Sequence, residues 1–438
     1  MGCDNRFYLR AYGCQMNLYE AGVVRKILAE RGFAETTEEA EADLVLLLTC
    51  SVRKHAEQRA IGRLQNLRSL KRARPEVILA VLGCMAQSRS EELANGLGAD
   101  LVVGPDEYRR LPELIDEYRR TGKSQIATRL GSECYEGVLS DAECGVRNAN
   151  CGVTGMVTVT RGCDNYCAYC IVPYVRGRER SKSRQAVLAE AEALVRNGVR
   201  DITLVGQNVL AYRDGDLDFG GLLRRADALE GSPWIRFLTS HPRDVTREFA
   251  SLLGELRNFC PHIHLPLQSG SDRILAAMNR KYTRAEYAER IAWLRAALPD
   301  VSLTTDVLVG FPGETDDDFQ ETLELVRETG FDFAYMFRYS ERSGTAACRL
   351  EAKVPESVAA DRLARLIAVQ NAITRERNRA LVGRRVEVLV EECRGAEARA
   401  RTRTNKVIAV KAALPAGVVR EVTVTDIKGW TPIAVSSE

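Results

Sequence analysis

The stretch Met156-Val-Thr-Val-Thr-Arg161-Gly162-Cys163-Asp-Asn-Tyr-Cys167-Ala-Tyr169-Cys170 passes from a strand into a loop with three cysteines. The β-branched run predicts the strand, and the glycine after it predicts a turn. The spacing C-x-x-x-C-x-x-C lets one loop wrap an iron–sulfur cluster with three thiolates. A cubane 4Fe–4S cluster has four irons, so one iron is left open to an exogenous chelator. Zinc would normally take a fourth Cys or His nearby, and none is evident.

Strands and helices alternate after this loop. Apolar and β-branched runs predict five further strands, at 202–205, 235–239, 263–265, 302–308 and 333–337. Helical patterns lie between them, at 184–197, 246–256, 284–297 and 317–328. With the first strand these make six βα units, so we expect an α/β core that forms a partial TIM-like (β/α)6 barrel.

Glycines and polar residues lie on or after several of these strands. Barrel active sites are built at the carboxyl ends of strands, so these residues are candidates for binding a cofactor. Each could also serve only to form the turn after its strand, because Gly and Pro are common in turns. The candidates are Gly206, Gln207, Ser240, Gln268, Asp306 and Gly310. For His241, His262 and His264 we expect hydrogen-bonded structural roles.

The first third of the chain has three continuous apolar runs, at 6–12, 43–48 and 77–82. Such runs predict parallel strands with both faces covered, and helical patterns at 20–31 and 54–74 separate them. We therefore expect a small parallel α/β domain.

Each of these strands ends in a cysteine, as Gly13-Cys14, Thr49-Cys50 and Gly83-Cys84. All carboxyl ends of a parallel sheet lie on one edge, which is where such sheets bind ligands. We expect the three thiolates to meet there and hold a second cluster. The alternative is three small apolar residues that happen to end strands.

The chain has 438 residues, 45% hydrophobic and 28% charged, as in soluble globular proteins. That length predicts two or three domains. The start lacks the apolar stretch of a leader, and no apolar run could span a membrane, so we expect a cytoplasmic protein. In that compartment the 13 cysteines indicate buried thiols, catalytic thiols or metal ligands rather than disulfides.

Basic residues are clustered, although 62 Lys and Arg nearly balance 60 Asp and Glu. Lys and Arg outnumber acids by eight to one over 53–74, five to one over 171–184 and six to one over 394–411. Such patches suit a polyanionic substrate. Solvated helix faces are the alternative.

A helix at 356–381 precedes a short all-β region that opens at Gly383. Strand patterns at 385–390, 406–410 and 418–425 predict a small barrel or sandwich. The segment from Arg399 to Lys406 offers Arg and Lys for phosphates and Asn for base edges, as RNA-binding surfaces do. The alternative is a small all-β region that does not bind RNA.

Changes in composition divide the chain. We expect an amino-terminal domain (1–122), a linker (123–155), a core (156–382) and a carboxyl-terminal β-domain (383–438). The linker holds Cys134, Cys144 and Cys151, for which free thiols are favoured over a third metal site.

Several motifs together resemble the radical S-adenosylmethionine methylthiotransferases, over nearly the whole chain. Tyr12-Gly-Cys14-Gln-Met-Asn17, Thr49-Cys50-Ser-Val-Arg53 and Leu82-Gly-Cys84-Met-Ala86 look like the three amino-terminal cysteine motifs of that family. Motifs of its core are matched by His264-Leu-Pro-Leu-Gln-Ser-Gly-Ser271, Val309-Gly-Phe-Pro-Gly-Glu-Thr315 and Tyr339-Ser-Glu-Arg-Ser-Gly-Thr345. Arg401-Thr-Arg-Thr-Asn-Lys-Val407 looks like its TRAM segment.

The resemblance implies a two-stage reaction on tRNA. S-adenosylmethionine chelates the open iron of the loop's 4Fe–4S cluster, and one-electron reduction cleaves it to methionine and a 5′-deoxyadenosyl radical. The radical takes hydrogen from carbon 2 of an isopentenylated adenosine next to the anticodon (position 37). A second 4Fe–4S cluster, on the strand-end cysteines, supplies sulfur that a second S-adenosylmethionine methylates.

The resemblance also implies residues and partners. Tyr169 is expected beside the adenine of S-adenosylmethionine. Contacts to the anticodon stem-loop of tRNA are expected from Arg178, Arg401, Arg403, Asn405 and Lys406. The base must be extruded from a stacked loop, at a cost that backbone contacts offset. A one-electron donor such as flavodoxin or ferredoxin is implied, and we expect a monomer.

Three other functions stay open at this point. Two belong to the same family: methylthiolation of a ribosomal-protein aspartate, and of threonylcarbamoyl-adenosine in tRNA. The aspartate branch typically has Pro-Lys-Asn after the first cysteine, where this chain has Gln15-Met16-Asn17. The third is a non-catalytic iron–sulfur RNA-binding protein, although a cluster without catalysis normally takes four cysteines.

One departure from the family concerns the exit of the loop. The family commonly has Ser-Arg-Pro there, and this chain has Ser181-Lys182-Ser183. The geometry of the exit therefore cannot be transferred from the resemblance.

Overall fold

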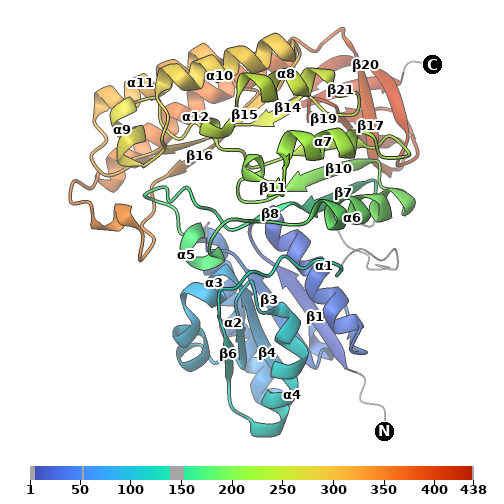
Figure 1. The fold of residues 1–438 in the computed structure, drawn as a ribbon, viewed down its shortest axis with the longest axis vertical. Helices are drawn as coiled ribbons and strands as arrows, with labels where there is room; N and C mark the ends of the chain where they lie inside the picture. The colour runs from blue at the N-terminus through green and yellow to red at the C-terminus, as the bar shows by residue number, and fades with distance from the viewer. Residues whose placement is uncertain (1–4, 52–53, 139–151, 437–438) are drawn as a thin grey trace. The chain divides into compact units, whose positions relative to one another are not determined.

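The computed structural model of the chain describes residues 5–51, 54–138 and 152–436, which form two compact units (Figure 1). The first unit comprises 1–148, 160–164 and 170–190, and the second comprises 149–159, 165–169 and 191–438. The loop with three cysteines thus supplies residues to both units.

A six-stranded parallel sheet forms the centre of the first unit, in the order β2-β1-β3-β4-β5-β6. Its strands are β1 (Arg6–Ala11), β2 (Ala34–Glu35), β3 (Leu44–Thr49), β4 (Ile78–Gly83), β5 (Leu101–Val103) and β6 (Gln125–Ala127). Every residue of β3 and β4 is buried. Apart from Thr49 at the end of β3, these strands carry no polar side chain, because helices cover both faces of the sheet.

The two faces carry different helices. Leu46 and Leu48 of β3 pack with α1 (Gln15–Ala29) and α4 (Leu111–Thr121), whereas Val45 and Leu47 pack with α2 (Lys54–Ala73). Successive strand residues point to opposite faces, so one strand serves both layers. The shorter elements of this unit are α3 (Cys84–Ser88), α5 (Val172–Arg176), β8 (Thr160–Arg161) and β9 (Arg180–Ser181).

The three strands predicted for this unit are confirmed to within one residue at each end. β5 and β6 are missing from the prediction, because three-residue strands carry too short an apolar run to be recognised. β6 lies inside the stretch expected to be a linker, and it pairs with β5. α1 begins five residues before its predicted start, because its buried side includes Met16 and the polar Asn17.

Six parallel strands of the second unit form a partial barrel, which confirms the α/β class predicted for the core. They pair as β7-β10-β13 and β14-β15-β16, and a bridge between Ile235 and Phe259 links the two sets. The strands are β7 (Thr154–Thr158), β10 (Asp201–Val205), β13 (Trp234–Phe237), β14 (His262–His264), β15 (Ser302–Val309) and β16 (Phe333–Arg338), with a hairpin of β11 (Arg213–Asp214) and β12 (Leu217–Asp218).

Helices alternate with these strands. They are α6 (Arg184–Arg196, which runs from the first unit into the second), α7 (Phe219–Asp227), α8 (Arg247–Glu255), α9 (Asp272–Ala277), α10 (Arg284–Ala297), α11 (Asp316–Thr329) and α12 (Glu356–Arg379). α7 and α9 are missing from the prediction, because Gly220 and Gly221 disfavour a helix in α7 and α9 has only six residues. None of the helices within residues 5–51, 54–138 and 152–436 combines the length and the hydropathy that a membrane span requires.

Five carboxyl-terminal strands close into a barrel in the order β17-β18-β19-β21-β20, which confirms the predicted small all-β domain. The strands are β17 (Arg385–Arg394), β18 (Glu397–Thr402), β19 (Val407–Val410), β20 (Val419–Lys428) and β21 (Thr431–Ser436). β18 and β21 are missing from the prediction. In β18 the buried positions include Ala398 and Ala400, which give little apolar signal.

The turn between β18 and β19 packs against the amino-terminal ends of the barrel strands, within the second unit. Arg236 of β13 pairs with Asp201 of β10 at 2.8 Å. It also donates to the main-chain oxygens of Thr402 at 2.9 Å and Arg403 at 2.7 Å. Arg403 in turn donates to the oxygen of Phe259 at 2.9 Å. Buried charge thus attaches the small barrel to the core.

We predict that Arg236→Ala lowers the free energy of unfolding by about 3–5 kcal/mol, because it leaves Asp201 as a buried charge without a partner. Urea denaturation followed by circular dichroism measures the change. The control is Arg224→Ala on α7, whose side chain is 60% exposed and pairs with Glu255, for which we expect about 1 kcal/mol or less. Equal losses in the two variants would contradict the prediction.

Candidate functional site

Cys14, Cys50 and Cys84, called the sheet cysteines below, reach the same edge of the first unit's sheet. Cys14 is the N-cap of α1, Cys50 follows β3, and Cys84 is the first residue of α3. β1, β3 and β4 are neighbours in the sheet, so the turns after them lie side by side. Cys50 and Cys84 are buried and Cys14 is half-buried.

Two glycines permit this close approach. Gly13 has φ +109°, and a Cβ on it would lie 2.3 Å from Cβ of Cys50. Gly83 has φ +93°, and its Cβ would lie 2.5 Å from the oxygen of Thr49. No other residue fits these positions without moving its neighbours, which explains the Gly-Cys pairs at 13–14 and 83–84.

Asn17 is a further residue of this site that the sequence prediction does not include. Its Nδ2 donates to the oxygen of Tyr12 at 2.6 Å, and its main-chain N–H donates to the oxygen of Cys14 at 3.0 Å. The side chain is buried, and its Oδ1 lies 3.7 Å from Sγ of Cys14. Asn17 therefore holds the turn that presents Cys14.

The thiols of Cys14 and Cys84 differ in acidity. A hydrogen bond with Cys50 lowers the pKa of Cys14 to about 6. Burial raises the pKa of Cys84, against the opposing charge of Arg176. Thiolates are the metal-binding form. Among the described residues no three His, Cys, Asp or Glu side chains stand close enough for a single metal ion. A cluster of several irons spreads its ligands more widely than one ion does.

A buried network lies beside Cys84. Arg176 of α5 donates from Nε to Sγ of Cys84 at 3.2 Å and from Nη1 to the carboxylate of Glu20 at 2.6 Å. Glu20, on α1, is 0% exposed, pairs with Arg161 at 2.9 Å and accepts from the hydroxyl of Tyr108 at 3.2 Å. The two guanidinium groups hold the pKa of Glu20 below its usual value, although burial alone would raise it.

The loop cysteines are Cys163, Cys167 and Cys170. The turn that opens their loop needs Gly162, which has φ +74° and whose Cβ would lie 2.0 Å from the oxygen of Arg178. Cys163 and Cys170 belong to the first unit and are half-buried, whereas Cys167 belongs to the second unit and is buried.

Cys167 has an arginine partner of its own. Arg280 donates from Nη1 to Sγ of Cys167 at 3.2 Å and from Nε to the hydroxyl of Tyr282 at 3.1 Å. The next residue, Ala168, donates to the oxygen of Met278 at 2.9 Å. Each set of cysteines therefore has one sulfur that faces a guanidinium N–H.

The predicted cofactor residues lie where the barrel strands end. Gly206 and Gln207 follow β10, Ser240 follows β13, Gln268 follows β14, and Asp306 and Gly310 lie in and just after β15. Ser240 donates to the oxygen of His264 at 2.6 Å, and Gln268 N–H donates to the oxygen of Asp306 at 2.8 Å. Tyr169 packs against a cluster that includes Met278 and Phe311. Their contacts with a cofactor stay predictions.

The side of β16 opposite α12 carries exposed aromatic rings, which the prediction does not include. Phe333, Tyr335 and Phe337 alternate along the strand and are 46%, 47% and 38% exposed. The ring of Tyr335 contacts those of Phe333 at 5.0 Å and His264 at 5.9 Å. A filled barrel interior holds Val, Ile and Leu. These rings instead leave flat surfaces open to a ligand, and the alternation in the sequence was the available signal.

The histidines have the hydrogen-bonded roles that we predicted. His262 and His264 both bond the hydroxyl of Thr304, at 3.0 and 3.1 Å, and His264 Nε2 lies 3.4 Å from a carboxylate oxygen of Asp306. His241 accepts from the main-chain N–H of Arg243 at 3.2 Å, and burial lowers the pKa of His241 to about 2.

Most of the residues expected to contact tRNA have partners in the chain itself. Lys406 pairs with Asp332 at 2.7 Å, and Arg401 pairs with Glu391. Asn405 accepts from Arg401 at 2.9 Å. Arg403 is tied to the core as described above. Asp332 comes from a distant part of the chain and Glu391 from the neighbouring strand β17, so the count of basic residues over 394–411 did not reveal either partner.

Arg178 is the most exposed of these residues. Its side chain is 80% exposed and pairs with Asp164 at 2.9 Å. The basic helix α2 is also partly neutralised, because Arg63 pairs with Glu39 at 2.6 Å and Lys71 with Asp100 at 2.9 Å. These patches carry less free charge than the sequence pattern indicates.

Lys182, which departs from the family pattern, is buried. Its ammonium pairs with Glu190 of α6 and bonds the hydroxyl of Tyr19 at 3.1 Å. Of the cysteines in the predicted linker, Cys134 donates to the oxygen of Ser181 at 3.7 Å. Cys144 and Cys151 lie outside the described residues.

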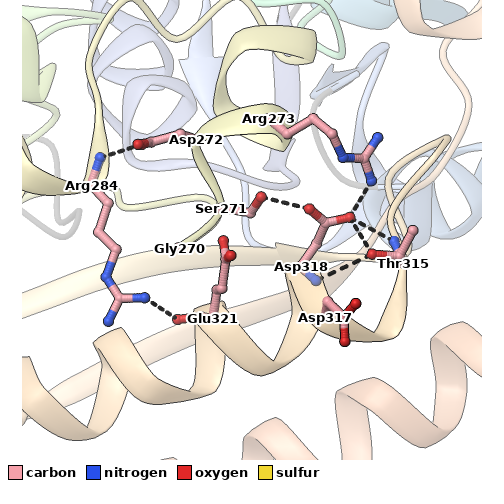
Figure 2. A pocket seen from close by; sticks show the side chains of 9 residues that line it. All are labelled: Gly270, Ser271, Asp272, Arg273, Arg284, Thr315, Asp317, Asp318 and Glu321. Atoms are coloured by element: carbon pink, nitrogen blue, oxygen red, sulfur yellow. Dashed lines mark hydrogen bonds and ion pairs between the residues drawn. The ribbon is translucent and has the colours of Figure 1, made fainter.

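A pocket of about 460 Å³ in the second unit lies at the starts of α9 and α11, and no cysteine lines it (Figure 2). Figure 2 shows Asp318 at its wall, with Ser271, Arg273 and Thr315 around its carboxylate. The hydroxyl of Ser271 donates to that carboxylate at 2.6 Å, and Arg273 and Thr315 also bond it. Asp318 and Thr315 form the capping box of α11, so these groups fix the loops after β14 and β15. Two of the motifs that resemble the family, at 264–271 and 309–315, therefore have a structural role here.

Two family models match the chain. The one described as the Radical SAM superfamily matches residues 157–326, and the one described as an uncharacterized protein family, UPF0004, matches residues 6–104. The first match includes the loop cysteines and the second includes the sheet cysteines.

Three relatives share the name tRNA-2-methylthio-N(6)-dimethylallyladenosine synthase. The protein of Moorella thermoacetica is 43% identical over 413 residues, which cover 92% of this chain and 91% of the relative. That of Bacteroides thetaiotaomicron is 43% identical and covers 89% and 86%, and that of Thermodesulfovibrio yellowstonii is 38% identical and covers 95% of both.

Solved structures share the fold at low identity. The radical S-adenosylmethionine methyltransferase TsrM from Kitasatospora setae, with tryptophan and an S-adenosylmethionine analogue bound, superposes with a TM-score of 0.58 at 16% identity, over 76% of this chain and 72% of that one. The cobalamin-dependent S-adenosylmethionine radical enzyme OxsB gives 0.55 at 12% identity, over 78% and 54%.

We predict that Gly13→Ala displaces Cys50 and lowers the iron bound by the sheet cysteines, because the added Cβ overlaps Cβ of Cys50. The measurement is iron and sulfide per chain after anaerobic reconstitution, in a variant whose loop cysteines are replaced by alanine. The control is Gly62→Ala, since a Cβ on Gly62 of α2 meets nothing within 4 Å. Full iron in Gly13→Ala would show that the strand ends do not need this close approach.

Proposed function

Because this chain belongs to the radical S-adenosylmethionine methylthiotransferase family, we propose that it attaches a methylthio group to carbon 2 of an isopentenylated adenosine in tRNA. The target is the adenosine next to the anticodon (position 37). The observation that carries the proposal is the similarity to synthases of that reaction along about nine tenths of both chains. Both cysteine sets fall inside the matched regions.

Radical S-adenosylmethionine enzymes use a 4Fe–4S cluster and S-adenosylmethionine. In our proposal the loop cysteines hold that cluster, with one iron left for S-adenosylmethionine. The sheet cysteines hold a second 4Fe–4S cluster. The chemistry of the donors fits both groups, because each set offers three thiols and an arginine N–H directed at one sulfur.

When bound, these groups supply the one-electron cleavage of S-adenosylmethionine and the sulfur that is transferred. The chain positions these groups and keeps water away from them. Burial of Cys50, Cys84 and Cys167 excludes water from the sulfurs. In our proposal Tyr169 lies beside the cofactor's adenine. The other cofactor-binding residues that we propose, on or after the barrel strands, are Gly206, Gln207, Ser240, Gln268, Asp306 and Gly310.

The target base has to leave its stack to reach a radical, which costs a few kcal/mol. Tyr335 and Phe337 present exposed ring faces on which an extruded purine and its apolar isopentenyl group can stack. Phosphate contacts offset the cost of extrusion. Arg178 is the best placed of the predicted contacts, because 80% of its side chain is exposed.

Arg401, Arg403, Asn405 and Lys406 belong to the predicted tRNA contacts as well. Each would have to exchange a partner within the chain for a phosphate or a base. Our proposal includes a one-electron donor such as flavodoxin or ferredoxin, and an enzyme that acts as a monomer in the cytoplasm.

The experiment that tests the function is anaerobic reconstitution with iron, sulfide, reductant and S-adenosylmethionine, followed by nucleoside mass spectrometry. We expect a methylthio group on isopentenylated tRNA and none on the same tRNA without the isopentenyl group. Parallel reactions contain tRNA with threonylcarbamoyl-adenosine and ribosomal protein. Formation of 5′-deoxyadenosine without methylthio-adenosine, or a product only in a parallel reaction, would reject the tRNA assignment.

We predict that joint replacement of the sheet cysteines by alanine halves the bound iron, because one of two clusters is lost. Thiolation should stop, while 5′-deoxyadenosine still forms at the intact loop cluster. Iron analysis and chromatography of 5′-deoxyadenosine measure the two effects. The matched control is Cys393→Ala, which removes an exposed thiol of β17 and should change neither quantity. Unchanged iron in the triple variant would refute the second cluster.

A further inference from the structure

Two buried arginines face the sulfurs of the two cysteine sets in the same way. Arg176 Nε lies 3.2 Å from Sγ of Cys84, and Arg280 Nη1 lies 3.2 Å from Sγ of Cys167. The arginines are 3% and 4% exposed. Each contact lies within a single unit, the first for Cys84 and the second for Cys167. Guanidinium groups are almost never buried without a compensating charge.

The network around Arg176 has more positive than negative charge. Arg161 and Arg176 share the carboxylate of Glu20, and Arg161 and Arg180 share that of Asp106. Three arginines thus face two carboxylates in the buried interior of the first unit. The surplus cation is directed at Cys84, so the charge balance calls for an anion at the sheet cysteines.

Arg280 has no carboxylate partner within the described part of the chain. Its Nε bonds the hydroxyl of Tyr282, its Nη2 lies 3.2 Å from the oxygen of Pro266, and its Nη1 faces Cys167. All three partners are neutral when Cys167 is a thiol. The charge of Arg280 is therefore compensated only when Cys167 becomes the thiolate ligand of an anionic group.

We propose that Arg176 and Arg280 are the counter-cations of the two clusters, and that each raises the reduction potential of its own cluster. The assignment of the clusters rests on the proposed function. Reduction adds one negative charge, so a fixed cation and an N–H donor at a ligand sulfur stabilise the reduced form more than the oxidised form. The arginines position and tune the clusters and do not contact the tRNA.

The consequence differs between the two clusters. The loop cluster must accept an electron from an external donor before S-adenosylmethionine is cleaved. Arg280 brings its potential closer to that of the donor. Arg176 acts on the second cluster, whose ligand Cys84 it contacts, and its own position depends on Glu20.

The test uses the full-length chain with one cluster at a time. Arg280→Met is made in the variant that lacks the sheet cysteines, and Arg176→Met in the variant that lacks the loop cysteines. Methionine approximates the length of arginine without its charge or its donors. Redox titration monitored by electron paramagnetic resonance should show the reduction equilibrium falling at least tenfold, about 59 mV for one electron.

Matched controls separate this local effect from a loss of surface charge. Arg120→Met in the first unit and Arg224→Met in the second remove side chains that are 71% and 60% exposed and pair with Glu117 and Glu255. We expect neither to shift a potential. Unchanged potentials in Arg176→Met and Arg280→Met at full iron content, or equal shifts in the controls, overturn the proposal.

If a methionine variant binds no iron or does not fold, lysine variants test the proposal instead. Arg176→Lys and Arg280→Lys keep the charge but cannot make all the contacts of a guanidinium. Recovered iron with a lowered potential supports the proposal, because charge holds the cluster and the lost donors tune it. An unchanged potential, or lost iron in a folded lysine variant, contradicts it. No tRNA is needed, so these outcomes are independent of whether tRNA is methylthiolated.

Discussion

The first unit depends on one interaction, in which Arg161 and Arg176 both pair with the buried carboxylate of Glu20. It joins α1 to two segments that come about 140 to 156 residues later in the chain. Glu20 holds both Nη atoms of Arg176, at 2.6 and 3.1 Å, while Nε of the same guanidinium group faces Cys84. Without that carboxylate two buried cations would have no shared counter-charge, a loss that typically costs several kcal/mol.

The second unit uses buried charge for a similar purpose. Arg236 attaches the turn around Thr402 to the barrel strands, and Lys406 adds a pair with Asp332. The basic segment of the small barrel therefore has a structural role as well as a proposed role toward RNA. The same side chains cannot do both at once, so an RNA-bound state would rearrange this turn.

Much of the fold followed from local patterns. Continuous apolar runs placed β3 and β4 because strands covered on both faces have no polar side. Two strands with a weaker local signal were not predicted. β6 has only three residues, and the buried side of β18 includes alanines. The exposed rings of β16 were visible as an alternation, but the face they occupy became clear only from the packing of α12 on the other side.

The sequence by itself determined where the cysteines would come together. Spacing within one loop restricts the loop cysteines, and parallel strands bring Cys14, Cys50 and Cys84 to one edge because their carboxyl ends share it. The tertiary structure alone decided which charges face those sulfurs. Arg176 and Arg280 are ordinary basic residues in the sequence, since the partners of a guanidinium group come from distant segments that no local pattern encodes.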